Sequence, residues 1–184
     1  MLEETKKDMI RLRTRWMSPQ GQATFVNVIS AIRANQSWVQ YLHGFIDVDE
    51  VLNRRDLRGA PLSMMDFQGA DFRNTSLDFV VFRGAHLKNA DFRGAELSHA
   101  DFREAVLVSA NFEGCLMVRA DLGSANLSKA CLVGAALTGA NLVETDFSEA
   151  NLTNAVLFGA KTEQAIFEKA TLENTRFGNF AAEE

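Results

Sequence analysis

The chain has 184 residues, a net charge of −5 and a hydrophobic content of 47%. This length allows one domain, or one domain with a small appendage, and the hydrophobic content argues against a disordered chain. The mild acidity argues against direct binding to nucleic acid, because contacts with phosphates need clustered lysine and arginine.

The N-terminal residues 1–10 are charged and lack the apolar core of a signal peptide. No apolar run approaches the length of a membrane span. Cys115 and Cys131 fall on repeat positions of opposite orientation, so we expect two reduced thiols rather than a disulfide. These features favour a cytoplasmic protein that does not contact a membrane.

Residues 1–52 predict an α-helical N-terminal cap. Apolar residues follow helical spacing in residues 2–17, at Met9, Leu12 and Trp16. Ser18-Pro19 is typical of a helix start, with serine as the N-cap and proline in the first turn. We expect these helices to cover the open end of the repeat region that follows, since an uncovered end exposes core side chains and unpaired strand edges.

From Leu57 to Phe177, every fifth residue is large and apolar with one exception. The 25 sites hold fourteen leucines, nine phenylalanines, Met117 and the exception, Thr162. Alanine fills 18 of the 25 positions that lie two residues earlier. A helix would spread these sites around its circumference, because five residues advance about 500°. A strand would turn each successive site to the opposite face, since its period is two.

A chain that turns a corner every five residues keeps all of these sites inside. Glycine, asparagine or serine often follows two residues after the large apolar residue, as at Gly69 and Gly134, and these are turn-forming residues. Alanine suits a narrow interior, where a larger residue would overpack the core. The spacing therefore predicts stacked coils with short extended sides.

Several repeats share the pattern A-[DN]-[LF]-x-x. The sequence reads ADFRN at 70–74, ADFRG at 90–94, ADFRE at 100–104 and ANLTN at 150–154. This unit resembles that of pentapeptide repeat proteins, over about two thirds of the chain. The resemblance implies an all-β solenoid, a right-handed quadrilateral β-helix with four repeats per coil. It predicts about six coils over residues 53–180, followed by a tail at 181–184.

We find no catalytic constellation in the sequence. It has no glycine-rich phosphate loop, no metal-ligand spacing and no nucleophile elbow. His43, His86 and His99 have no partner that the sequence identifies, and the recurrent aspartates follow the repeat rather than an acid–base pair. We therefore expect no enzymatic activity, no cofactor, no metal and no small-molecule substrate.

Four repeats per coil, the number implied by the resemblance, assign each outward residue to a face and a level. On the face that begins at Leu57, three successive levels are almost wholly apolar. We call these six residues the apolar wall: Leu116, Val118, Ala136, Thr138, Val156 and Phe158. A contiguous exposed apolar patch usually marks an interaction surface, so we expect the wall to bind a protein partner or a second copy. The alternative is that the N-terminal helices or the C-terminal tail cover it within the chain.

The sequence favours a non-enzymatic protein–protein interaction module, a rigid scaffold that binds a partner protein or itself. The resemblance supplies an alternative, because some members of the family, which is largely bacterial, mimic DNA, bind DNA gyrase (a type II topoisomerase) and protect it from quinolones. Such members tend to form dimers at their C-terminal ends, where Phe177 and Phe180 lie in this chain. Against this alternative, arginines interrupt the acidic faces and the net charge is modest. A secreted effector is a third class, which nothing in residues 1–8 specifically supports.

Overall fold

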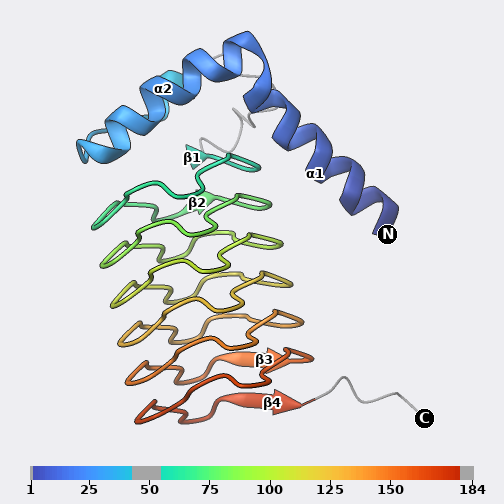
Figure 1. The fold of residues 1–184 in the computed structure, drawn as a ribbon, viewed down its shortest axis with the longest axis vertical. Helices are drawn as coiled ribbons and strands as arrows, with labels where there is room; N and C mark the ends of the chain where they lie inside the picture. The colour runs from blue at the N-terminus through green and yellow to red at the C-terminus, as the bar shows by residue number, and fades with distance from the viewer. Residues whose placement is uncertain (1, 43–54, 179–184) are drawn as a thin grey trace.

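Two helices and a tower of stacked coils make up the described part of the chain (Figure 1). The computed structural model describes residues 2–42 and 55–178. The helical elements are α1 (Leu2–Met17), α2 (Pro19–Arg33) and the short 3₁₀ helix η1 (Val39–Leu42). The strands are β1 (Arg55–Asp56), β2 (Thr75–Ser76), β3 (Val156–Phe158) and β4 (Arg176–Gly178). The expected boundary at 52/53 and the tail 181–184 lie outside the described residues.

Each coil pairs with the next through residues twenty positions apart. β1 and β2 are parallel, with Arg55 opposite Thr75, and β3 and β4 are parallel, with Val156 opposite Arg176. Single bridges keep the same register along the tower, for example between Asp91 and Asn111. Four five-residue sides therefore complete one coil, and the tower is a quadrilateral β-helix with the helices at its N-terminal end (Figure 1).

The large apolar residues of the repeat fill the interior of the tower. Every such site from Leu57 to Leu157 is buried. Phenylalanines stack in columns, with ring centroids 5.0 Å apart for Phe72 and Phe92 and 4.7 Å apart for Phe92 and Phe112. The small alanines beside them leave room for the rings, and burial of this apolar surface is the main force that holds the coils together.

The aspartate or asparagine of the repeat has a structural role that was missed in the sequence. At all eleven places where one of them precedes the large apolar residue, its side-chain oxygen accepts a hydrogen bond from the backbone N–H two residues further on. We call this contact the Asx bond. It satisfies a backbone donor next to the corner, which short side chains with a terminal oxygen do well.

Three residues that replace the inward alanine form another repeated contact. Each donates a hydrogen bond to a backbone carbonyl 23 residues earlier, at 2.7–2.8 Å. The pairs are Cys115 with Phe92, Thr145 with Leu122, and Thr175 with Leu152. These residues are slightly larger than alanine, and the hydrogen bond satisfies the polar atom that they bring into the interior.

The helices contact the first coil of the tower. Ser18 is the N-cap of α2, as the sequence indicates, and its hydroxyl oxygen accepts the N–H of Gly21 at 3.0 Å. Trp16 of α1 is buried and donates its indole N–H to the carbonyl of Arg58 at 2.8 Å. Neither α1 nor any other helix in the described residues is long and apolar enough to cross a membrane.

Candidate functional site

The apolar wall occupies three adjacent levels of one face. Leu116 forms a bridge with Ala136, and Ala136 forms one with Val156. The same column continues to Glu96 at one end and, through β3 and β4, to Arg176 at the other. The wall is therefore an apolar stretch with an acidic residue at one edge and a basic residue at the opposite edge.

Leu116 is the most exposed side chain of the wall, at 49%. The other five wall residues are half-buried. Coils stack at about 4.8 Å, so outward side chains on adjacent levels cover part of each other. The wall is thus a shallow apolar surface with one protruding side chain.

Asx bonds are rare on the face that carries the wall. Asp56 is the only aspartate or asparagine among seven such positions on this face, whereas the other three faces have ten among 18. Leu116, Ala136 and Val156 stand in these positions within the wall. In the described part of the chain, no side chain accepts a hydrogen bond from the backbone N–H groups two residues after them. Three successive levels thus lack a local stabilising contact, which points to a role for this surface other than stability.

The two edges of the wall carry ordered side chains of opposite charge. Ser76 donates its hydroxyl to Oε2 of Glu96 at 2.9 Å. Nearby, burial is the main reason that the pKa of Asp78 is raised. The negative charge of Glu96 also raises this pKa, whereas the hydrogen bond from the Ser98 N–H lowers it. At the opposite edge, the guanidinium of Arg176 lies 5.8 Å from the ring centroid of Phe158.

Helix α1 lies beside a corner next to the wall. It lines a cavity of about 450 Å³ together with this corner, and the main lining residues are Lys6, Met9, Phe79, His99 and Arg119. The rings of Phe79 and His99 stack at 5.1 Å, and burial and the charge of Arg119 lower the pKa of His99. His99 is therefore neutral at pH 7 and packs against its aromatic neighbour. The tail, the other segment that was considered as a cover for the wall, lies outside the described residues.

The C-terminal end of the tower presents core-type side chains at its surface. Phe177 is 46% exposed and Leu172 is 39% exposed, although both occupy inward sites of the repeat. Phe167 contacts Phe177 edge to face, with ring centroids 6.2 Å apart. Phe180 lies outside the described residues, so the expected contact role of Phe177 and Phe180 stays a prediction.

Arginines pair with several aspartates on the first levels of the tower. Arg73, Arg93 and Arg103 each bind the aspartate two residues earlier, at Asp71, Asp91 and Asp101. The hydrogen bond from Arg73 is the main reason that the pKa of Asp71 falls to about 2. These carboxylates are consequently charged but paired at neutral pH, by the arginines that interrupt the acidic faces in the sequence.

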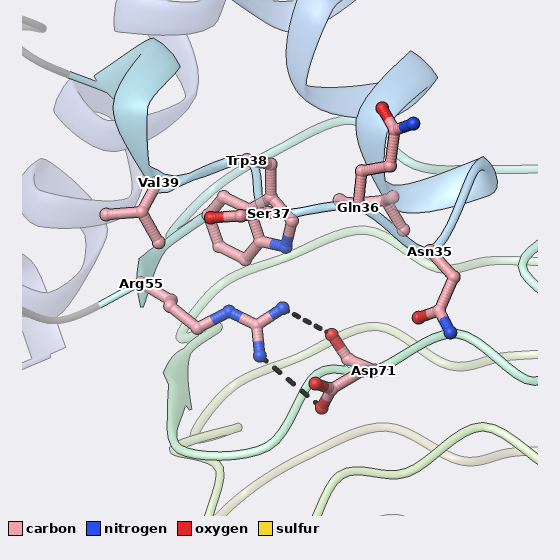
Figure 2. A pocket seen from close by; sticks show the side chains of 8 residues that line it. Asn35, Gln36, Ser37, Trp38, Val39, Arg55 and Asp71 are labelled. Carbon is pink, nitrogen blue, oxygen red and sulfur yellow. Dashed lines mark hydrogen bonds and ion pairs between the residues drawn. The ribbon is translucent and has the colours of Figure 1, made fainter.

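A cavity of about 350 Å³ lies at the junction of the helices and the tower (Figure 2). Arg55 stacks on Trp38 at 4.6 Å, and its guanidinium binds the carboxylate and the carbonyl of Asp71. The indole N–H of Trp38 is buried and has no partner among the described residues. Because the guanidinium of Arg55 is already bound to Asp71 of the first coil, we interpret this cluster as a structural contact between the helices and the tower. Within the described ranges, no group of three or more histidine, cysteine or acidic side chains is placed to hold a metal ion.

The geometry defines a class, the solenoid repeat proteins, whose stacked coils present flat outward faces. A family model described as pentapeptide repeats matches the chain in eight copies, within residues 52–89, 66–104, 105–142, 130–161 and 137–179. The chain therefore belongs to the pentapeptide repeat family. Members of this family form right-handed quadrilateral β-helices and are in general structural scaffolds rather than enzymes.

Solved structures of family members are similar to the chain. The pentapeptide repeat protein Rfr23 from the cyanobacterium Cyanothece 51142 is 28% identical, with 67% of this chain and 88% of that chain covered and a TM-score of 0.31. HetL from Nostoc sp. strain PCC 7120, involved in heterocyst differentiation regulation, is 20% identical, with 72% and 93% covered and a TM-score of 0.34. QnrB1, a plasmid-mediated fluoroquinolone resistance protein, is 19% identical, with 67% and 79% covered and a TM-score of 0.33. A comparison with curated proteins found no match.

Proposed function

We propose that the chain is a non-enzymatic protein–protein interaction module that binds a protein through the apolar wall. Its scaffold is a β-helix of about six coils, closed at the N-terminal end by α1 and α2. One observation carries this proposal. On three successive levels, Leu116, Ala136 and Val156 occupy the position where aspartate or asparagine would form an Asx bond. These three levels therefore lack the Asx bond and present an apolar surface instead. The centres of protein–protein interfaces are apolar in the same way.

The packing of the core beneath the wall keeps the wall in a fixed shape. Buried Met117, Leu137 and Leu157 and continuous backbone pairing hold each level against its neighbours, so the outward side chains have little freedom to move apart. A partner then binds a surface that is already ordered, and the entropy lost on binding is small.

Affinity capture with charge-introducing variants tests the wall. Val118→Asp combined with Phe158→Asp places two charges on the wall without altering an inward residue. Val106→Asp combined with Val108→Asp is the matched control, because both residues are also half-buried and outward-facing but lie on another face. We expect the wild type and the control to retain a partner that the wall variant loses, with circular dichroism unchanged in all three. Retention of every partner by the wall variant would contradict the proposal.

The DNA-mimic alternative requires an extended acidic face. The pairing of Asp71, Asp91 and Asp101 with arginines reduces the negative charge that such a face would present. We therefore expect no effect of the protein on gyrase. A supercoiling assay with gyrase and a quinolone decides the matter, and protection or inhibition at micromolar protein would reinstate the alternative.

A further inference from the structure

We propose that the partner of the apolar wall is a second copy of the chain, packed face to face and antiparallel. The two-fold axis runs across the wall at the level of Ala136 and Thr138. This inference rests on the proposed function of the wall and identifies the partner.

The wall residues are placed symmetrically about this level. Neighbouring levels differ by twenty residues, so the levels of Leu116 and Val156 lie one coil to either side of Ala136. In an antiparallel pair, Leu116 faces the partner's Val156 and Val118 faces the partner's Phe158. Ala136 and Thr138 face their own counterparts at the axis. Apolar side chains therefore meet apolar side chains on the two outer levels, and alanine and threonine meet their own counterparts on the central level.

The charged edges select the antiparallel orientation. Glu96 lies two levels from the axis on one side and Arg176 lies two levels from it on the other. Each Glu96 therefore faces the partner's Arg176, and the symmetry forms this ion pair twice. In a parallel pair, each level faces itself, so Glu96 faces the partner's Ser98 and Arg176 faces the partner's Gly178. Only the antiparallel pair brings opposite charges together.

The local contacts of both residues suit this pairing. The hydroxyl of Ser76 holds Glu96 at the edge of the wall, and the ring of Phe158 supports the guanidinium of Arg176. Both side chains are thus positioned before association, which reduces the entropy that their pairing costs.

The size of the surface sets the expected affinity. Five levels at about 4.8 Å give a contact about 24 Å long. Three extended residues at about 3.3 Å make the side about 10 Å wide, so the contact covers about 240 Å² per partner. A standard interface has roughly 800 Å² per partner, so we expect a concentration-dependent dimer with a dissociation constant in the micromolar range or above. The edge ion pairs are partly exposed, and the dimer should weaken as the salt concentration rises.

Sedimentation velocity of variants with reversed charges at Glu96 and Arg176 tests the proposal. The expected affinity sets the protein concentration at about 5–500 µM. Glu96→Arg and Arg176→Glu should each raise the dissociation constant of the dimer at least tenfold, because each places like charges at both edges. An equimolar mixture of the two variants should dimerise as well as the wild type, since the mixed dimer has opposite charges at both edges. The double variant E96R/R176E should also dimerise. A purely structural role of either residue would not produce this rescue.

Control variants separate the wall from other surfaces. Glu113→Arg makes the same charge change on another face and should leave the dimer intact. If Glu96→Arg lowers the melting temperature, the double variant Glu96→Gln with Arg176→Gln is used in its place. This neutral variant should remove most of the salt dependence of the dissociation constant. Loss of the dimer in Phe177→Asp together with a normal dimer in Glu96→Arg would assign association to the C-terminal end and overturn the proposal.

Two further outcomes would also overturn it. One is a wild type that stays monomeric at the highest concentration, and the other is a mixture of charge variants that fails to associate. Neither outcome affects the broader function of the wall, because capture of a different protein by the wild type and its loss in the wall variant test that function separately.

Discussion

Arg15 of α1 and Asp56 of β1 form a buried ion pair across 41 residues of sequence. Nη2 of Arg15 donates to Oδ1 of Asp56 at 2.8 Å, and Nη1 donates to Oδ2 at 3.2 Å. Arg58 binds the same carboxylate through its own guanidinium and its backbone N–H. Both partners of the pair are almost fully inaccessible to solvent, so this contact joins the helices to the first coil.

Replacement of Arg15 by alanine should lower the free energy of unfolding by about 3 kcal/mol, because it removes one partner of a buried ion pair. Arg58 stays bound to Asp56 and limits the loss. Urea denaturation followed by tryptophan fluorescence measures the change. Arg11→Ala is the control on the same helix, because Arg11 and its ion-pair partner Asp8 are exposed, and it should cost less than about 0.5 kcal/mol. Equal losses in both variants would contradict this role of Arg15.

Acid should destabilise the protein through its paired aspartates. The pKa of Asp71 is about 2, chiefly because of the hydrogen bond from Arg73. Burial acts to raise the pKa of Asp56, Asp91 and Asp101, but arginine hydrogen bonds outweigh it and the pKa of each is lowered. A folded pKa below the unfolded value of about 3.9 stabilises the fold fully above about pH 4, and this stability is lost as the pH falls toward 2.

Asp78 acts in the opposite direction, because burial raises its pKa and its protonation therefore favours the folded state. We expect the net effect to follow the four paired aspartates. Melting temperatures between pH 7 and pH 2 measure it, with Asp71→Asn as the reference. This variant should melt below the wild type at pH 7, and the difference should close as the pH approaches 2. A difference that is constant with pH would show that Asp71 contributes through packing alone.

The five-residue period was sufficient to predict stacked coils, because it is local and no insertion interrupts it, whereas the four sides of each coil came from the resemblance to the family. The period assigns Leu57 and Phe72 to the interior without any knowledge of distant contacts. The ion pair of Arg15 and Asp56 could not be predicted from the sequence, because it is a long-range contact. It depends on how α1 docks on the first coil, and no spacing in the sequence encodes that orientation.

Ala136→Asn should stabilise the fold and weaken the wall. An asparagine at this position can accept the backbone N–H of Thr138, as the eleven Asx bonds do elsewhere. The free energy of unfolding should rise by about 0.5–1.5 kcal/mol, the net value of one hydrogen bond. The polar side chain lies at the centre of the wall and should reduce association there. Calorimetry measures the first effect and sedimentation the second.

Asn126→Ala is the reverse experiment, on another face. It removes an Asx bond and should destabilise the protein by a similar amount without changing association. If Ala136→Asn is no more stable than the wild type, the Asx bond is not what the wall lacks.

The candidate site was only partly accessible from sequence. The face and level of Val118 follow from the repeat, but its partial burial depends on how closely the levels stack. The Asx bond was missed because the sequence shows Asp or Asn before a large apolar residue at only eleven of 25 sites, and that frequency alone does not distinguish a turn contact from solvent exposure. The structure distinguishes them, and the scarcity of this bond on one face then marks the wall.

The two cysteines should differ sharply in reactivity. Burial raises the pKa of the Cys115 thiol to about 12, and the thiol donates to the carbonyl of Phe92. The thiolate is the reactive species, so Cys115 should be inert near pH 8 while the half-buried Cys131 reacts. Titration with a chromogenic disulfide reagent should therefore modify one thiol per chain in the native protein and both in denaturant. Cys131→Ser should abolish the native reaction and Cys115→Ser should preserve it. Rapid modification of both thiols in the native protein would mean that the coil around Cys115 opens, contrary to the packing of the core.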